Sequence, residues 1–365
     1  MKKSESSRRE FLRTSKDLAL GVMAGSLGLG SVGCRTRRDK PVVSIAKIKN
    51  DRIDMAVESA IELLGGMGAL AHGKDRIMLK PNLTNATSED TTHPEVVKTL
   101  VSLMKTAGKS VLIGEGSAGA RGFNVIDHEI CRTNKAEILD PMQQFVFDEL
   151  GYSELSKSLD APLVNLHSGE IARVDVPNAF VCDKLSFRQS LTEVDLLCSV
   201  PKMKTHQLAT VTLGMKNLLG LLPGTVYHSI RRDIHERTSV IDPSGTAAII
   251  VDLLKAMPLG LVVVDGSMAM EGQGPSISTG GALVKMDLII AGKNALATDM
   301  VAAHVMGFEP EEIPTFAWAH RAGMTPKRID EIEVRTDGPV VRQALAKPNV
   351  TTWASIRESY GERAL

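Results

Sequence analysis

The sequence is poor in cysteine and aromatic residues and has no excess of charge of either sign. Its 365 residues include four Cys, 4% are aromatic, and 43 Lys and Arg balance 43 Asp and Glu. The balanced charge gives no reason to expect a nucleic-acid partner, and the interior has no apolar run long enough to span a bilayer. With 43% hydrophobic and 24% charged residues, the composition is that of a globular chain. It excludes a disordered, collagen-like or disulfide-scaffold protein.

The cysteines beyond the N-terminal segment are too few and too widely spaced to build a metal centre. Cys131, Cys182 and Cys198 include no Cys-x-x-Cys pair. A zinc or iron–sulfur site needs three or four closely spaced thiolates or imidazoles, so no self-contained iron–sulfur cluster is expected. We expect three buried free thiols, and pairing of Cys182 with Cys198 in an oxidising compartment is the alternative.

The N-terminal residues have the pattern of an export signal. The segment Ser7-Arg8-Arg9-Glu10-Phe11-Leu12-Arg13 is a twin-arginine motif, and a weakly hydrophobic, glycine-rich stretch follows over residues 18–30. The pattern predicts a twin-arginine signal peptide over residues 1–33, with the twin-arginine translocase as a partner. Because that route carries folded proteins, a cofactor can be installed before export.

The predicted signal ends in a sequence similar to a lipoprotein processing site. In Ser31-Val32-Gly33-Cys34, Cys34 would become the acylated first residue of the mature chain, although Ser31 stands where Leu is usual. A diacylated Cys34, followed by a tether over residues 34–41, would hold the protein on the periplasmic or extracytoplasmic face of a membrane without spanning it. A signal that is simply cleaved, or is left uncleaved, is the alternative.

The rest of the chain has the pattern of an α/β protein. Apolar β-branched runs alternate with segments of helical period, which predicts a parallel or mixed sheet covered by helices. We expect this domain over residues 42–340, with an irregular inserted subdomain at about 121–183 and a C-terminal extension over 341–365. The expected strands include 42–48, 76–79, 111–113, 194–200, 261–264 and 283–291, and the expected helices include 52–64, 94–108, 246–257 and 295–306.

Polar residues follow several of the predicted strands at their carboxyl ends, where ligands bind in open α/β sheets. Lys80 and Asn82 follow the strand 76–79, and His93 precedes a helix that begins at Pro94. Because the N-terminus of a helix favours anions, these three side chains are candidates to bind a carboxylate or phosphate. The alternative is that Thr92 or His93 only caps the helix and Lys80 is solvated.

A glycine-rich turn follows the strand 111–113. Its sequence, Gly114-Glu115-Gly116-Ser117-Ala118-Gly119, has the spacing of a dinucleotide-binding motif. In a dinucleotide site the Glu115 carboxylate would lie against the negatively charged pyrophosphate. Gly122 would interrupt the helix that should begin there, and no strand follows at the distance that a βαβ unit requires. We therefore do not interpret this motif as a dinucleotide site. We interpret it as a tight turn that exposes Glu115, a further candidate to contact a ligand.

The most cationic loop follows the strand 194–200. It reads Pro201-Lys202-Met203-Lys204-Thr205-His206, and Lys216-Asn217 follows about ten residues later. Lysines this close repel one another unless an anion lies among them, and repulsion with burial lowers the lysine pKa toward values useful for proton transfer. We therefore expect an anion at Lys202, Lys204, His206, Lys216 and Asn217. A basic solvated loop is the alternative.

Three acidic residues lie in or near the last loops. Asp265 and Glu271 follow the strand 261–264, and Asp299 lies on a later helix. They are hard oxygen ligands that suit Mg²⁺ or a related divalent metal, and Asp265 and Glu271 are alternatively an acid/base pair. Nearby, His228, Arg231, Arg232 and His235 share one face of a predicted helix, which favours a solvated or anion-contacting surface over a zinc site.

Several of these motifs together resemble the domain of unknown function 362 family, over about residues 42–307. The motifs are Lys80-x-Asn82, His93-Pro94, Pro201-Lys202-x-Lys204-Thr205-His206, Lys216-Asn217-x-x-Gly220, Asp265, Glu271-Gly272-x-Gly274-Pro275 and Asp299. The resemblance implies an α/β fold with no settled activity. It also implies a loose link to redox or iron–sulfur chemistry, because some relatives look like fusions of this domain to a ferredoxin-type iron–sulfur module. This chain lacks the cysteine motifs of such modules.

These observations lead to three hypotheses of function. The first is an exported enzyme that binds a small anionic molecule, with His206, Lys204 or Lys216 as general base and Asp265 with Glu271 holding a metal or acting as the acid. The second is a non-catalytic assembly or carrier protein whose partner is a redox or iron–sulfur protein. The third is a solute-binding lipoprotein. The sequence names neither the reaction nor the cofactor.

Overall fold

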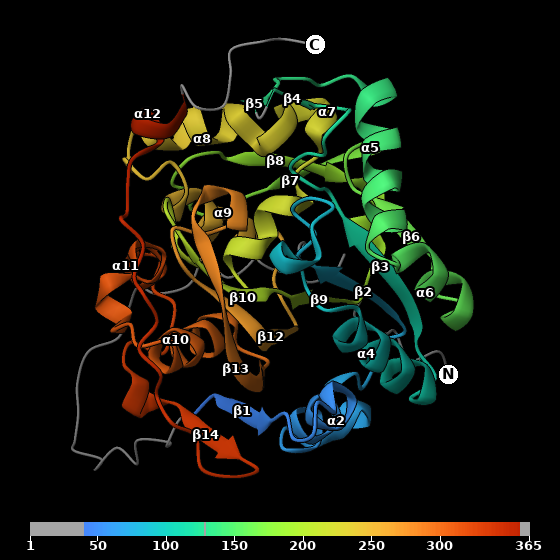
Figure 1. Cartoon of the computed structure of the whole chain (residues 1–365), viewed down its shortest axis with the longest axis vertical. Coiled ribbons are helices and arrows are strands. Elements are labelled where there is room, and N and C mark those ends of the chain that lie inside the picture. Colours follow the sequence, from blue (N-terminus) through green and yellow to red (C-terminus); the bar gives the residue numbers. More distant parts are fainter. Residues whose placement is uncertain (1–39, 128, 358–365) are drawn as a thin grey trace, which may run out of the picture.

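The computed structural model describes residues 40–127 and 129–357, and one large mixed sheet runs through them (Figure 1). The twin-arginine motif, the predicted lipidation site Cys34 and the last eight residues of the C-terminal extension lie outside the described residues. Among the helices that the structure describes, none is both long and apolar enough to cross a membrane.

The main sheet has the strand order β14-β1-β13-β12-β9-β2-β3-β6, with β10 beside β12 and β11 beside β10. Strands β12, β9, β2, β3 and β6 run parallel, whereas β13 is antiparallel to both of its neighbours. The bounds are β1 Val42–Lys47, β2 Arg76–Pro81, β3 Ser110–Glu115, β6 Leu163–Asn165, β9 Leu196–Val200, β10 Lys202–His206, β11 Thr210–Thr212, β12 Leu261–Gly272, β13 Gly281–Gly292 and β14 Glu333–Thr336.

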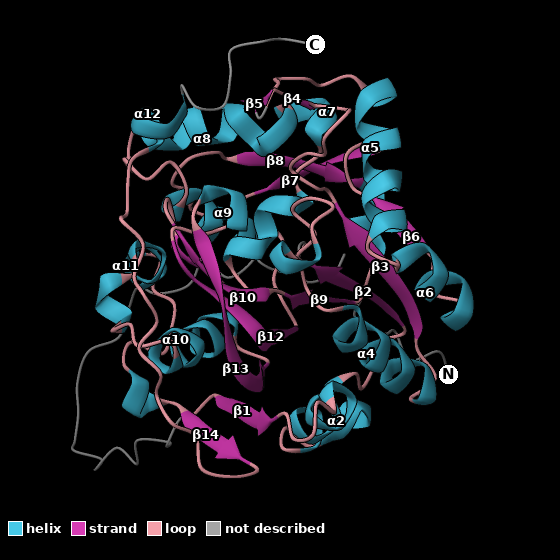
Figure 2. Cartoon of the chain, viewed as in Figure 1, coloured by secondary structure: helices cyan, strands magenta, loops and turns pink. Residues whose placement is uncertain are grey.

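Helices cover both faces of this sheet (Figure 2). One face carries α2 Ile53–Glu62, α3 Gly66–Leu70, α4 Pro94–Thr106, α5 Ala136–Glu149 and α6 Tyr152–Leu159. The other carries α9 Ala247–Ala256, α10 Ala295–Val305 and α11 Pro314–Arg321, together with the hairpin of β7 Ile171–Asp175 and β8 Lys184–Arg188.

Two hydrophobic cores form because side chains alternate along each central strand. On β2, Ile77 and Leu79 pack into one core and Met78 packs into the other, and all three are fully buried. This alternation requires apolar residues at successive positions, as in a sheet covered on both faces. The predicted α/β fold class is therefore confirmed.

The middle of the chain is more regular than expected for an insertion. Strand β6 extends the main sheet by pairing with β3, and α5 and α6 cover the sheet beside α4. Two small hairpins lie outside the main sheet, β7 with β8 and the short pair β4 Val125–Ile126 and β5 Glu129–Ile130.

The cationic segment Pro201–His206 was expected to be a loop, but its residues Lys202–His206 form strand β10. It pairs in parallel with β12 and antiparallel with β11, with Lys204 opposite Thr212 and His206 opposite Thr210. Lys and His have little intrinsic preference for strands, so the sequence alone does not predict this pairing. Because side chains alternate along a strand, Lys202, Lys204 and His206 lie on the same face.

The C-terminal extension crosses the end of β12 as an ordered strap, which we define as residues 341–356. Ala346 N–H donates to Glu271 Oε2 at 2.8 Å, and Thr351 N–H donates to the carbonyl of Gln207 at 2.8 Å. The strap ends in α12 Trp353–Ile356, where the Trp353 ring stacks on His235 with centroids 4.6 Å apart. The strap therefore covers the loop that follows His206.

Candidate functional site

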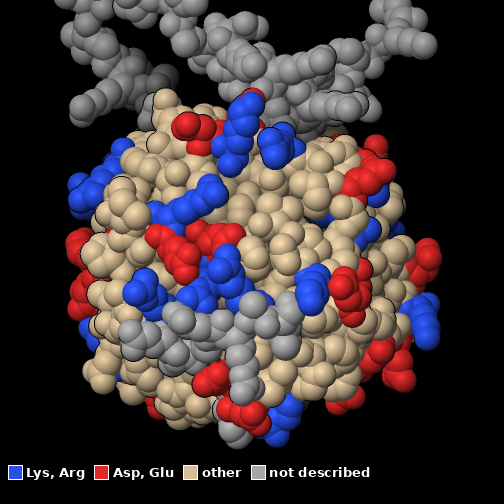
Figure 3. Space-filling view, turned by 90° about the horizontal axis from the view of Figure 1, so that it is seen from above, with Lys and Arg blue, Asp and Glu red and all other residues tan. Residues whose placement is uncertain are grey.

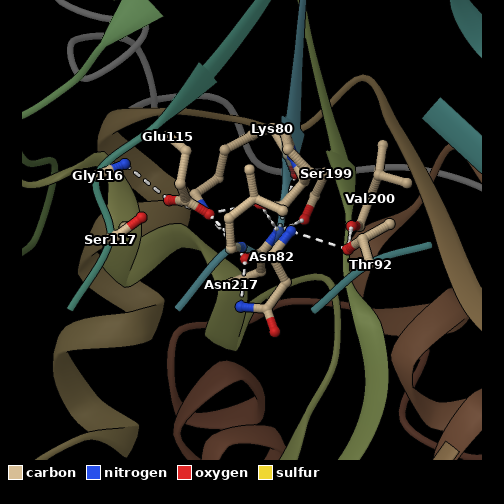
Figure 4. Close-up of polar contacts among 12 residues, drawn as sticks. Lys80, Asn82, Thr92, Glu115, Gly116, Ser117, Ser199, Val200 and Asn217 are labelled. Atoms are coloured by element: carbon tan, nitrogen blue, oxygen red, sulfur yellow. Dashed lines mark hydrogen bonds and ion pairs between the residues drawn. The ribbon is translucent and has the colours of Figure 1, made fainter. Parts of the chain in front are cut away.

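The carboxyl ends of β2 and β3 are joined by a buried ion pair (Figure 4). Lys80 Nζ lies 2.7 Å from Glu115 Oε1, and the two side chains are 1% and 2% exposed. The Glu115 carboxylate also accepts the backbone N–H groups of Leu83 and Gly116, each at 2.8 Å. Burial lowers the pKa of Lys80, and Glu115 partly offsets that effect. Glu115 was expected to be exposed, but its contacts place it inside the protein as the counter-ion of Lys80.

The turn that follows Lys216 completes this cluster. Asn217, on the 3₁₀ turn η4 Lys216–Leu221, accepts from Lys80 Nζ through Oδ1 at 2.8 Å. Gly220 lies directly against the ion pair, since a Cβ atom there would approach Lys80 Nζ to 2.6 Å. Lys80, Glu115 and Asn217 were each predicted to contact a ligand. Their polar groups instead bind one another.

Arg231 brings a further buried positive charge close to this cluster. Its guanidinium donates to the carbonyls of Gly116, Ser117, Gly220 and Leu222. Residues His228, Ile230 and Arg231 all have positive φ, so the expected continuous helical face over residues 228–235 is interrupted. Burial lowers the pKa of Arg231 to about 10. Of the two expected roles of this face, solvated or anion-contacting, the solvated one does not hold for Arg231 and His235, because both are buried.

Lys202 and Lys204 lie deep in the protein on the shared face of β10. They are 3% and 0% exposed. Lys204 Nζ donates to the carbonyl of Asp90 at 2.7 Å, whereas Lys202 Nζ has no hydrogen-bond or ion-pair partner among the described residues. Burial lowers the pKa of Lys204 to about 7, and the positive charges of Lys202 and Lys216 contribute to that shift.

Lys216 is the least buried of the three lysines, and its ammonium has no partner within residues 40–127 and 129–357. Burial lowers its pKa to about 7, and the charges of Lys80 and Arg231 act in the same direction. A lysine with this pKa is partly neutral near pH 7 and can then accept a proton. The first cause of this lowered pKa is burial, and the repulsion comes from Lys80 and Arg231 and not from the neighbouring lysines of the 201–206 segment.

Asp299 holds the backbone just before Lys216. Its carboxylate accepts the N–H groups of Gly214 and Met215, each at 2.8 Å. Burial nevertheless raises the pKa of Asp299 to about 7, because the two hydrogen bonds offset only part of the desolvation. Asp299 was predicted as a metal ligand, but its contacts make it a residue that positions Lys216.

His206 is held as a neutral imidazole. Leu208 N–H donates to Nδ1 at 3.1 Å, so the ring carries its proton on Nε2. Burial holds the pKa of His206 well below its ordinary value, and the charges of Lys216 and Lys204 lower it further. In this tautomer Nε2 donates a hydrogen bond and does not accept a proton, so His206 is better suited to bind an anion than to act as general base.

Three buried polar oxygens close to these lysines lack a partner among the residues that the structure describes. They are the hydroxyls of Thr210 and Thr212 and Oδ1 of Asn82, on residues that are 3% to 4% exposed. Thr210 and Thr212 lie opposite His206 and Lys204 across the β10–β11 ladder, so all four side chains share one face. Buried polar groups are normally hydrogen-bonded, so unpaired ones indicate a place for a ligand or ordered water. Neither threonine was predicted as a site residue, although Lys202, Lys204 and His206 alternate in the sequence as side chains on one face of a strand do.

The three predicted metal ligands do not form one site. Asp265 accepts from His93 N–H and from the Ser267 hydroxyl, and Glu271 binds the strap at Ala346. Within the described part of the chain, no three His, Cys, Asp or Glu side chains come close enough together to hold a metal ion. Asp265 and Glu271 lie at different points of β12, on either side of its register shift, and each has its own partners. The prediction of a shared metal site is therefore wrong.

His93 lies on the outer side of Asp265. It caps α4 by accepting Glu95 N–H through Nδ1 at 3.2 Å, as the alternative interpretation predicts, and its side chain is exposed. With Ser267 it lines a cavity of about 710 Å³ that also reaches Arg52 and Lys285. None of Lys202, Lys204 and Lys216 is among the residues that line this cavity.

The cysteines Cys131, Cys182 and Cys198 are buried and free, as expected, and Cys182 does not pair with Cys198. On the surface seen in Figure 3, positive and negative side chains are interspersed over the described residues. Beneath the surface, Lys202, Lys204 and Arg231 are buried positive charges.

The chain is similar to known proteins of two kinds. It is 29% identical over 276 residues to the thylakoid-associated protein sll1697 of Synechocystis sp., a match that covers 74% of this chain and 75% of that protein. The lactate racemase apoprotein of Thermoanaerobacterium thermosaccharolyticum matches 72% of this chain and 56% of its own, with 15% identity and a TM-score of 0.44. The family model described as a domain of unknown function, DUF362, matches residues 77–304. That match covers more than half of the sequence, and the chain belongs to the DUF362 family.

Proposed function

We propose that this protein is an enzyme that binds a small anion among Lys202, Lys204, Lys216 and His206 and transfers a proton with Lys216. The observation that carries the proposal is the Lys216 ammonium, which has no partner among the described residues although three other cations, Lys80, Lys204 and Arg231, lie around it. Neighbouring positive charges at a buried site repel one another, and a bound anion relieves that repulsion.

The backbone at Thr210 supports the same proposal. Thr210 has φ of 65°, which is unfavourable for a β-branched residue, and its hydroxyl is buried without a partner in the described chain. Strained backbone of this kind costs about 1–3 kcal/mol and occurs most often at active sites and ligand clamps. The strain holds the Thr210 hydroxyl opposite His206, where both groups can donate to an anion.

The proposed chemistry follows from the two lysines with lowered pKa. Both pKa values are lowered to about 7, so near neutral pH each lysine is present in both its protonated and its neutral form. The protonated lysine attracts the anion. The neutral one accepts a proton from the bound molecule, and Lys216 is favoured for this role because Lys204 already donates to Asp90.

The affinity for a small anion should fall as the pH rises through about 7, because Lys204 and Lys216 have pKa values of about 7 and an anion binds their protonated forms. If one proton must be taken up with the anion, the affinity falls by up to about tenfold per pH unit above that value. Calorimetric titration with inorganic phosphate at several pH values between about 6 and 9 measures this profile. An affinity that does not change over this range would contradict the proposed role of the lysines.

We also propose that the protein is exported by the twin-arginine translocase and anchored through lipid on Cys34. The support is the motif at Arg8 and Arg9 and the processing-site sequence that ends in Cys34. Replacing Cys34 by Ala should move the protein from the membrane fraction to the soluble extracytoplasmic fraction, since one diacylated residue supplies the anchor. Fractionation followed by immunoblotting measures the change, and equal membrane retention of both forms would argue against lipidation.

A further inference from the structure

The amide groups of Asn217 and Asn82 can be oriented in only one way. Asn217 Nδ2 donates to the carbonyls of Lys80 and Pro81 at 3.0 and 3.3 Å, so its Oδ1 faces Lys80 Nζ at 2.8 Å. Asn217 Oδ1 can only accept hydrogen bonds, so the neighbouring Asn82 side chain must present its donor group to it. Asn82 Nδ2 therefore donates to Asn217 Oδ1 at 3.2 Å. Oδ1 of Asn82 is left on the opposite side of the amide, and it points away from the Lys80–Glu115 pair (Figure 4).

The Asn82 oxygen is a buried acceptor on the loop that also carries Asp90, the partner of Lys204. Asn82 is 4% exposed, and no described residue donates to its Oδ1. The same short loop holds both Asn82 and Lys204, since Thr92 N–H donates to the Asn82 carbonyl at 3.0 Å and Lys204 donates to Asp90. A hydroxyl can turn to donate or accept, but this oxygen can only accept.

We propose that the anion bound by the lysine cluster carries a hydrogen-bond donor of its own and donates it to Asn82 Oδ1. This inference rests on the proposed function because it specifies the ligand of the same site. Lysine side chains only donate, so they hold any small anion, whereas a buried acceptor left unpaired disfavours an anion without a donor. Two kinds of molecule have the required chemistry: a phosphate group that retains a proton and a hydroxy-carboxylate.

Calorimetric titrations of the full chain with two pairs of anions test the inference, and glycolate with acetate is the pair that is matched in charge. The chain is kept in the cytoplasm by replacing Arg8 and Arg9 with Lys, and the titrations are run at about pH 6, where the lysines are protonated. Phosphate retains a proton at this pH and sulfate does not. Glycolate has a hydroxyl that acetate lacks.

The expected result is that the donor-bearing member of at least one pair binds about tenfold or more tightly than its partner. Preference for phosphate identifies a phosphate ligand, and preference for glycolate identifies a hydroxy-carboxylate. Equal affinities within both pairs would overturn the donor inference and leave the anion site in place. Absence of binding by all four anions would overturn the proposed function as well.

The variant Asn82→Leu replaces the amide by an apolar side chain of similar size and so removes the acceptor Oδ1. It should lose the preference for the donor-bearing member of each pair. The matched control is Asn124→Leu, because Asn124 is equally buried but its amide is satisfied by the backbone of Ala118 and Ala120. The control should keep the preference. If Asn82→Leu does not fold, the ratio of the two wild-type affinities within each anion pair tests the inference alone. A folded Asn82→Leu variant that keeps the preference overturns the inference.

Discussion

The free energy of unfolding should fall by about 3–5 kcal/mol when Glu115 is replaced by Gln, because the substitution leaves the Lys80 ammonium buried without its counter-ion. The two side chains are 1% and 2% exposed, and Glu115 also accepts two backbone N–H groups. Urea unfolding of the wild type and the variant measures the loss. We expect this to be the largest change in stability from any single charge-removing substitution at the site.

The control for this prediction is Glu193→Gln. Glu193 pairs with Arg76 at 3.2 Å, but the side chains of Glu193 and Arg76 are 45% and 42% exposed. Ion pairs of that exposure contribute about 0–1 kcal/mol because water screens them. Losses of similar size in the two variants would mean that the Lys80–Glu115 pair is not buried as described.

Replacing Lys216 by Met should abolish anion binding and at the same time raise the melting temperature. The first effect follows from losing the ammonium that has no other partner in the described chain. The second follows because the positive charge that burial disfavours is removed. Calorimetric titration with phosphate and thermal unfolding of the same preparation measure both effects. A variant that is less stable than the wild type would identify Lys216 as a structural residue.

The stability that Lys216→Met gains over the wild type should decrease as the pH rises. The pKa of Lys216 is lowered from 10.5 to about 7 on folding, so the unfolded chain binds more protons between these values and wild-type stability rises with pH there. The advantage of Lys216→Met is therefore largest below pH 7 and shrinks as the pH approaches 10.5. The matched control is Lys109→Met. The Lys109 side chain is 14% exposed, and its ammonium lies 3.8 Å from Asp75. It should neither gain stability nor lose anion binding.

The parts of the site that follow buried parallel strands could be predicted from the sequence. Lys80, Asn82 and Glu115 were placed at one edge of the sheet because each follows or ends an apolar run, and the carboxyl ends of parallel strands meet there. The sequence does not indicate that two of these side chains, Lys80 and Glu115, form an ion pair with each other. Lys80 and Glu115 are 35 residues apart and bind each other, so neither is available to a ligand.

The acidic residues could not be placed because their positions depend on where β12 ends. The apolar run over residues 261–264 suggested a loop from Asp265 onward, in which Glu271 would fold back toward Asp265. The strand instead continues to Gly272, since β13 pairs with it along its whole length through a register shift after Gly266. Tertiary pairing thus separates residues that local sequence signals place together.

The edge of the sheet also sets an order in which the chain can fold. Strand β1 begins at Val42, yet both of its neighbours come from the last part of the chain: Val43 pairs with Gly292 of β13 and with Val334 of β14. Contacts between residues so distant in sequence form slowly, because a long loop must close before they stabilise the fold. During synthesis β1 therefore stays unpaired until nearly the whole domain has left the ribosome, and its backbone groups are open to pairing with other chains. Chain termination before residue 281 would leave that exposed strand without a partner.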